Sequence, residues 1–343
     1  MASVIERLPF GIGAVDLNTE GGWLVGRVNL LTGRPKTGKT TVAGYALASF
    51  HTHDKRRAWL YNGEYKLSLD WLVKLGADAA RMEIRPPQFL EEVCDEIIYT
   101  VMAAEGTDVG FVFIDGIRMI PSQVRDGVGE KSSVAYSPIS PEAHILNRFF
   151  AKVALYQAKR IWNGHAPVTL FIVNHETRGM PVGDFAAPIV IPGGTVQLFA
   201  AGLRIRFVMP QYLGKRTVEG MEIATRVEFN FTVEANLGGR SQNSGVFRMY
   251  QTERTGEIDE VEQYIAWGEQ VGFLKASEKN VTVDGEEIGG EGRPALVAYW
   301  RTHPQQYDIH KQEIMRQVQQ FLADLPLLER KKKGDGRQKK AAG

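Results

Sequence analysis

The sequence predicts an α/β protein with a mostly parallel central sheet covered by helices on both faces, followed by a small α+β domain. Three observations support this prediction. Apolar segments of strand length alternate with segments of helical period through the first half of the chain, which is the arrangement of parallel sheets. Several strand candidates are continuous apolar runs, as expected when both faces of a strand are buried. After residue 200, apolar and polar residues alternate, which is typical of antiparallel strands.

The elements expected in the first domain follow in chain order. Parallel strands are predicted at 26–32, 57–61, 109–114 and 168–173. Helices are predicted at 41–50, 67–75, 90–104 and 141–162. Antiparallel strands are predicted at 203–208 and 225–233.

The composition changes again near residue 260. Helices are predicted at 259–271, 295–301 and 307–322, around a glycine-rich turn at 284–292. From residue 328 the chain is a run of basic residues with Gly and Ala, which predicts a disordered tail. The expected divisions are therefore a core at 1–258, a small α+β domain at 259–327 and a basic tail at 328–343.

Bulk composition excludes some classes of protein. Lys and Arg number 41 against 40 Asp and Glu, so the net charge does not indicate a partner. The single cysteine, Cys94, rules out an intrachain disulfide and a cysteine-cluster metal site. No apolar run approaches the roughly 18 residues of a membrane span, and no signal peptide is apparent. We therefore expect a cytoplasmic protein with no membrane contact.

A phosphate-binding loop follows the first strand candidate. Gly33, Gly38, Lys39 and Thr40 match the pattern Gly-x4-Gly-Lys-Thr between an apolar strand and a helix. In this pattern backbone N–H groups hold the phosphates, the lysine contacts the β- and γ-phosphates, and the hydroxyl binds Mg²⁺. The residues expected to contact ATP are Gly33, Arg34, Pro35, Lys36, Thr37, Gly38, Lys39, Thr40 and Thr41.

Three further polar residues follow predicted strands. Asp115 ends the strand at 109–114, where a carboxylate holds the Mg²⁺ ion of such sites together with Thr40. Glu64 follows the second strand and is either the base that activates water or a solvated loop residue. His175 follows the strand at 168–173 and is either a γ-phosphate sensor or a histidine at the sheet edge.

At this point the sequence resembles the RecA recombinase family, over nearly its whole length. The matching segments are Leu-Pro-Phe-Gly-Ile-Gly-Ala-Val-Asp-Leu at 8–17, Gly-Glu-Tyr at 63–65 with Trp71-x2-Lys-Leu-Gly, Pro-Gly-Gly at 192–194, and Asp-Gly-Glu-Glu-Ile-Gly-Gly-Glu-Gly at 284–292. The resemblance implies a catalytic role for Glu64 and adenine stacking for Trp71. His175 lies where the family usually has the glutamine of its γ-phosphate sensor.

The resemblance also implies two DNA-binding loops. One lies at 122–140 and contains Arg125 and Lys131, and the other lies at 176–191 and contains Arg178 and Phe185. Gly193 and Gly194 close the second loop. Long loops of this composition are often functional, and basic and aromatic side chains contact phosphates and bases.

The implied function is that of an ATP- and Mg²⁺-dependent recombinase, which forms a helical filament on single-stranded DNA and pairs it with homologous duplex DNA. Two alternatives stay open: a ring-forming hexameric replicative helicase-like ATPase, and an ATP-regulated single-strand annealing protein. Only seven residues precede Leu8, so the family's N-terminal subunit-docking helix is nearly absent. With His175 replacing glutamine, this suggests a divergent member such as phages encode.

Overall fold

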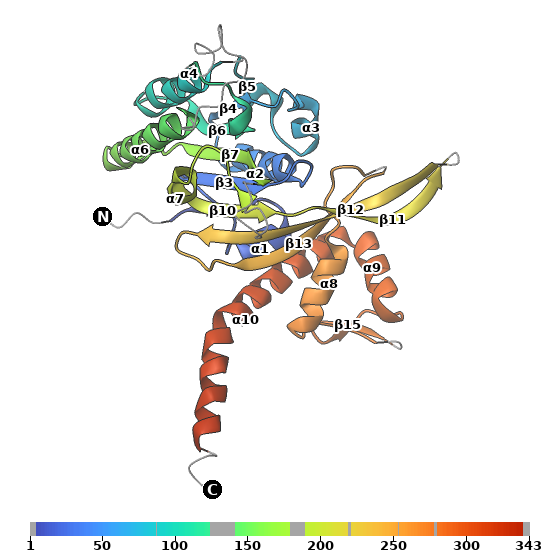
Figure 1. Cartoon of the computed structure of the whole chain (residues 1–343). Coiled ribbons are helices and arrows are strands. Elements are labelled where there is room, and N and C mark those ends of the chain that lie inside the picture. Colours follow the sequence, from blue (N-terminus) through green and yellow to red (C-terminus); the bar gives the residue numbers. More distant parts are fainter. Residues whose placement is uncertain are drawn as a thin grey trace, which may run out of the picture. The chain divides into compact units, whose positions relative to one another are not determined.

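The computed structural model describes residues 5–86, 88–123, 141–178, 189–218, 221–252, 254–277 and 280–338. The chain divides into two compact units, Met1–Ile258 and Asp259–Gly343, each with its own buried apolar side chains. The division falls where the sequence pattern changes near residue 260. The predicted α/β class with a mostly parallel sheet is confirmed (Figure 1).

Nine strands of the described chain form the central sheet of the first unit. Their order is β11-β12-β10-β3-β7-β6-β4-β5, and β13 pairs with β12. The strands from β10 to β5 run parallel to their neighbours, whereas β11, β12 and β13 pair antiparallel. Their bounds are β3 Val28–Gly33, β4 Arg57–Asn62, β5 Met82–Ile84, β6 Val109–Asp115, β7 Thr169–His175, β10 Ala201–Phe207, β11 Gln211–Val218, β12 Met221–Asn236 and β13 Asn243–Tyr250.

Helices cover both faces of the parallel part, because its strands are apolar on both sides. In β6, Val112 and Ile114 pack under α4 (Leu90–Asp95), η2 (Glu96–Met102), α6 (Pro141–Trp162) and α7 (Val196–Ala200). Phe111 points to the opposite face, where α2 (Lys39–His53) packs its Phe50 ring 5.2 Å from that of Phe111. Successive strand residues point to opposite faces, so a continuous apolar run is what a sheet between two helical layers requires.

Two sequence predictions for the first unit differ from the structure. The segment predicted as one α-helix at 90–104 is α-helical only to Asp95 and continues as a π-helix, where Glu96 accepts a hydrogen bond from Tyr61. The strand predicted at 203–208 as antiparallel is β10, which is parallel to β3 and antiparallel to β12. Its alternation arises because one face is buried and the other carries Arg204 and Arg206. Alternation thus reports a polar face and not strand direction.

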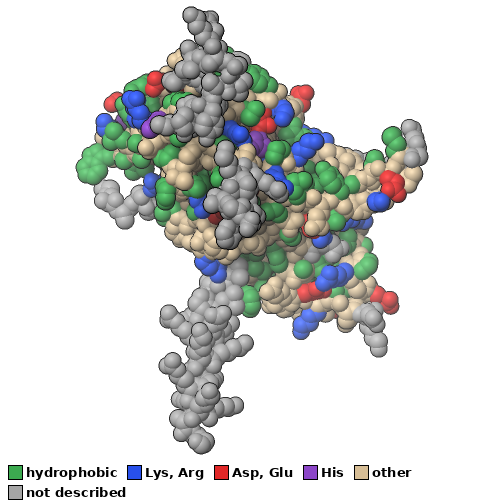
Figure 2. All heavy atoms as spheres, viewed as in Figure 1, with side chains coloured by type: hydrophobic (Ala, Val, Ile, Leu, Met, Phe, Trp, Pro, Cys, Tyr) green, Lys and Arg blue, Asp and Glu red, His purple; other side chains and the backbone are tan. Residues whose placement is uncertain are grey.

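The remaining elements of the first unit are short. They are β1 Arg7–Leu8, α1 Gly13–Asn18, β2 Trp23–Leu24, α3 Leu69–Lys74, η1 Ala79–Arg81, η3 Ile117–Met119, β8 Thr177–Arg178 and β9 Ile189–Val190. Strands β11 and β12 extend beyond the sheet as a two-stranded arm (Figure 1). Acidic and basic side chains are interspersed on the face that Figure 2 shows. In the arm, Lys215 and Glu222 form an ion pair at 2.7 Å.

The second unit combines helices with a three-stranded antiparallel sheet. Its elements are α8 Val261–Gln270, β14 Leu274–Ala276, β15 Val281–Val283, β16 Glu286–Glu287, α9 Gly292–Thr302 and α10 Pro304–Gln338. The expected disorder from residue 328 is wrong as far as Gln338, where α10 ends. Lys, Arg, Glu and Leu are good helix formers, and adding residues to an existing helix is far easier than starting one. In the described chain, no helix is long and apolar enough to cross a membrane.

Candidate nucleotide site

The phosphate-loop sequence connects β3 to α2 at the carboxyl edge of the sheet. Gly33 and Gly38 have φ values of 144° and 88°, a backbone region that side chains other than glycine rarely adopt. A Cβ atom on Gly38 would lie 2.7 Å from the Phe229 ring, and one on Gly33 would collide with the carbonyl of Phe207. Both glycines of the pattern are therefore required by backbone conformation and by close packing.

Lys39 begins α2 and points back into the loop. It is 3% exposed, and its Nζ donates hydrogen bonds to the carbonyls of Gly33 at 3.1 Å and Arg34 at 2.6 Å. Burial lowers the pKa of Lys39 to about 8, although the carboxylates of Glu64 and Asp115 oppose that shift. A phosphate beside this ammonium group would raise the pKa of Lys39 again, because an opposite charge favours the ionised form.

Thr40 and Asp115 meet between the start of α2 and the end of β6. The Thr40 hydroxyl donates to the two carboxylate oxygens of Asp115 at 3.1 and 3.3 Å. Asp115 is 3% exposed, and burial raises its pKa to about 6, with the nearby Glu64 carboxylate adding to the effect. A hydroxyl beside a buried carboxylate is an oxygen donor set that suits Mg²⁺, which takes one or two protein ligands and completes its shell with phosphate and water.

Glu64 follows β4 and His175 ends β7, the two strands that flank β6, and their side chains contact each other. The Glu64 carboxylate is hydrogen-bonded to Nε2 of His175, and Lys66 lies 3.5 Å from its other oxygen. Burial favours the neutral acid, but the hydrogen bond and charge of His175 outweigh it and hold the pKa of Glu64 below its usual value. The second ring nitrogen of His175 lies 3.4 Å from Lys39 Nζ. His175 thus links the lysine of the loop to the carboxylate.

A second network joins the end of β7 to the segment that carries the two expected loop glycines. Asn174 is fully buried and donates to the carbonyl of Pro192 at 2.9 Å and to Gln197 at 2.8 Å. Gly193 and Gly194, with φ values of 89° and 81°, pack against Leu146 and Ala143 of α6, respectively. Sequence reasoning missed Gln197, because a lone glutamine in a short helix carries no recognisable pattern.

Trp71 lies apart from this cluster in the contacts of the described residues. It is half-buried in α3, and its ring borders Gly256, where an added Cβ would lie 3.1 Å from the Trp71 ring. Gly256 also accepts a hydrogen bond from Tyr45 of α2 at 2.6 Å. Adenine stacking by Trp71 stays a prediction.

Three of the six residues predicted to bind DNA lie outside the described part of the chain. These are Arg125, Lys131 and Phe185. Arg178 is described only through its backbone, in β8, which pairs with β9. The DNA-binding roles of these residues therefore stay predictions.

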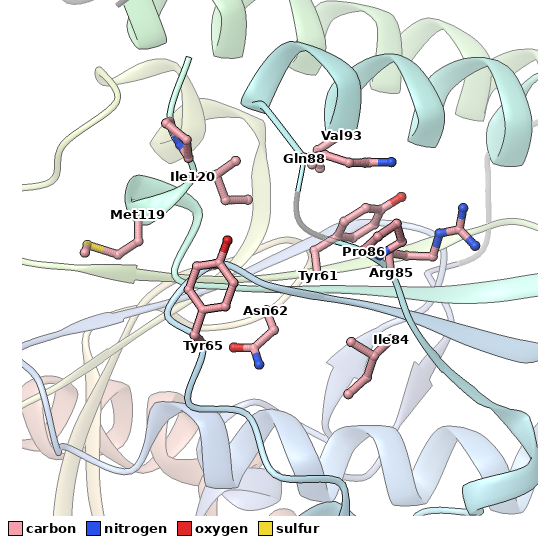
Figure 3. A pocket seen from close by; sticks show the side chains of 12 residues that line it. Tyr61, Asn62, Tyr65, Ile84, Arg85, Pro86, Gln88, Val93, Met119 and Ile120 are labelled. Carbon is pink, nitrogen blue, oxygen red and sulfur yellow. The ribbon is translucent and has the colours of Figure 1, made fainter. Parts of the chain in front are cut away.

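A cavity of about 200 Å³ lies on the other side of the Glu64 segment (Figure 3). Asn62, Gly63 and Tyr65 line it from the Glu64 side, and Met119 and Ile120 from the segment that follows Asp115. No phosphate-loop residue lines it. The cavity is therefore separate from the candidate nucleotide site around Lys39.

The sheet, with the phosphate-loop sequence between β3 and α2, defines a RecA-like α/β core. No family model matches the chain. Similar curated proteins are each named Protein RecA. That of Frankia alni is 22% identical over 330 residues, which cover 95% of this chain and 86% of the relative. That of Kineococcus radiotolerans is 24% identical over 306 residues, with coverages of 88% and 80%. That of Nostoc punctiforme is 24% identical over 229 residues, with coverages of 66% and 59%. These distant similarities support a RecA-like family of recombinases and ATPases.

Proposed function

We propose that the protein is a DNA-dependent ATPase that assembles on single-stranded DNA and promotes pairing and strand exchange with homologous duplex DNA. One observation carries the ATPase part of the proposal. Lys39, Thr40, Glu64, Asp115 and His175 lie at one edge of the sheet, joined by contacts between the ends of β3, β4, β6 and β7. Open α/β sheets bind their ligands at this edge.

Each residue of the cluster has a role in ATP hydrolysis in this proposal. The loop N–H groups and Lys39 bind the phosphates, and Thr40 and Asp115 hold Mg²⁺, which neutralises phosphate charge when bound. Glu64 is kept ionised by His175 and accepts the proton of the attacking water. His175 contacts the γ-phosphate in this proposal. Because it also contacts Lys39 and Glu64, it couples the presence of that phosphate to the position of the Glu64 carboxylate.

The DNA part of the proposal rests on the relatives and on the second network. The similarity to the Frankia alni protein covers 95% of the chain and so extends through the second unit as well as the ATPase core. This favours a RecA-type recombinase over an ATPase that shares the core alone. Asn174 lies beside His175 and is hydrogen-bonded to Pro192 and Gln197. In this proposal these contacts couple the nucleotide site to the end of the predicted second DNA loop.

Joint-molecule formation tests this function. The protein is mixed with single-stranded DNA, homologous duplex DNA, Mg²⁺ and ATP, with a heterologous duplex and the Lys39→Ala variant as controls. Joint molecules that require homology and ATP support strand exchange. Annealing of complementary single strands without any invasion of a duplex would assign the protein to the annealing class instead.

Electron microscopy with a slowly hydrolysed ATP analogue tests assembly on the same single-stranded DNA. The proposal expects helical filaments. Closed rings that unwind forked DNA would assign the protein to the helicase class and overturn the proposal. The two assays separate the three function classes by activity and by architecture.

A further inference from the structure

A partly buried ion pair adjoins the Glu64–His175 contact. The side chain of Glu176, the next residue after His175, is 5% exposed. Arg206 of β10 donates to one of its carboxylate oxygens from Nε at 2.6 Å and to the other from Nη2 at 3.1 Å. A guanidinium bound through two parallel hydrogen bonds fixes the direction of a carboxylate as well as its charge. The pair therefore fixes the side chain of residue 176 against β10.

The main chain of Glu176 is fixed as well. Its N–H donates to the carbonyl of Gly33 at 3.1 Å, and the same carbonyl accepts a hydrogen bond from Lys39 Nζ at 3.1 Å. In the register of β3 and β10, Arg206 lies opposite Thr32, the residue before Gly33. Glu176 thus ties together the carboxyl ends of β7, β3 and β10 at the start of the phosphate loop.

His175 lies between two anchored neighbours. On one side, Asn174 is fully buried, and its side chain accepts a hydrogen bond from the N–H of His175 at 2.8 Å. On the other side, Glu176 is held by Arg206. Adjacent side chains of an extended chain point to opposite faces, so anchoring both neighbours on one face aims the His175 ring at the other, where Glu64 lies.

We infer that Glu176 and Arg206 form a positioning pair that holds His175 between Lys39 and Glu64. This inference rests on the proposed function, in which His175 contacts the γ-phosphate. In this inference the pair acts through His175 and not by direct contact with the nucleotide. Reactions that depend on placement are sensitive to it, since a misplacement of about 1 Å costs on the order of 10²-fold in rate.

The same strands supply a matched control. Arg204, two residues before Arg206 on β10, pairs with Glu234 of β12 at 2.8 Å. Its side chain is 20% exposed, compared with 31% for Arg206. Glu234 also lies 4.0 Å from Nε of Arg206. Arg204→Gln therefore removes an ion pair from the same strand and keeps both hydrogen bonds between Arg206 and Glu176.

The first measurement compares Glu176→Gln and Arg204→Gln with the parent chain in DNA-stimulated ATP hydrolysis. We expect kcat of Glu176→Gln to fall about 10- to 100-fold with little change in the dissociation constant for ATP, since placement rather than phosphate binding is lost. Arg204→Gln should hydrolyse ATP at the parent rate. Arg206→Lys keeps the positive charge but loses the bidentate hydrogen bonding, so its kcat should also fall. This variant replaces Glu176→Gln in the test if Glu176→Gln does not fold. Weaker ATP binding at unchanged kcat would overturn the inference, because Glu176 would then act through the charge of Lys39.

The decisive measurement repeats Glu176→Gln in a His175→Ala background. If the pair acts through His175, the second substitution costs nothing further in kcat. If the two losses multiply, the inference fails while the role of His175 stands. If His175→Ala alone leaves kcat unchanged, the proposed role of His175 fails and the inference with it. Thermal melting of each variant establishes that the compared proteins are folded.

Discussion

Replacing Asp115 by asparagine should stabilise the protein while abolishing its activity. Burial raises the pKa of Asp115 from the usual 3.8 to about 6, so keeping this carboxylate ionised at neutral pH costs about 3 kcal/mol of folding free energy. The asparagine removes that cost, and its oxygen can still accept the hydrogen bond from Thr40. Its amide leaves buried N–H groups that cost about 1 kcal/mol. We expect a net gain of about 2 kcal/mol in the free energy of unfolding without nucleotide.

The stability difference between the parent protein and Asp115→Asn should depend on pH. Because the folded-state pKa is above the unfolded one, the cost of the Asp115 charge is absent below about pH 4 and complete above about pH 6. Urea unfolding of both proteins, followed by tryptophan fluorescence in EDTA, should therefore show the Asp115→Asn variant as the more stable one at about pH 7.5. As the pH falls toward 4 this difference should shrink and then reverse, leaving the variant less stable by about 1 kcal/mol, because only the cost of the buried amide remains.

Asp54 provides a control, because its pKa is shifted in the opposite direction from that of Asp115. Burial favours its neutral form, but the hydrogen bonds and charge of Arg56 outweigh burial and lower its pKa. Asp54→Asn should therefore lose stability at neutral pH, and this loss should shrink on acidification. ATP with Mg²⁺ should stabilise the parent protein more than Asp115→Asn, since a ligand stabilises the folded state in proportion to its affinity and the variant lacks one group proposed to hold Mg²⁺. An Asp115→Asn variant that is less stable than the parent by the same amount at every pH would refute the reasoning.

Three further predictions concern nucleotide binding and hydrolysis. Lys39→Ala should abolish hydrolysis and most ATP binding, because it removes the buried ammonium of the loop; turnover near that of the exposed-site control Lys55→Ala would reject the phosphate-loop assignment. Glu64→Gln should keep ATP binding and lower kcat by about 10²- to 10⁴-fold, as measured by phosphate release with single-stranded DNA, and rapid hydrolysis by this variant would mean that another group is the base. Trp71→Ala should weaken ATP binding by on the order of 1 kcal/mol through lost stacking, as titrated with a fluorescent ATP analogue. The matched control is Trp162→Ala, at a side chain that is 86% exposed, and equal affinities in the two variants would remove Trp71 from the adenine site.

Much of the parallel core could be read from local sequence. The helix predicted at 141–162 is α6, Pro141–Trp162, and the strand predicted at 109–114 is β6, Val109–Asp115. These segments have a strong helical periodicity or a continuous apolar run, and both patterns can be recognised from residues close together in the sequence. The π-helix after Asp95 could not be predicted, since its residues have the same apolar spacing as an α-helix and differ only in which carbonyl each N–H reaches.

The sequence by itself determined the phosphate loop and the places of Asp115, Glu64 and His175 at strand ends, because these depend on spacing and on the rule that parallel strands end at one edge. Only the tertiary structure decided which of these residues touch. The hydrogen bond between Glu64 and His175 joins residues 111 positions apart, and that between Arg206 and Glu176 joins residues 30 positions apart. Such contacts depend on strand order, with β6 between β4 and β7 and with β10 beside β3. Strand order is set by the packing of whole elements, and no local pattern around Glu176 or Arg206 records it.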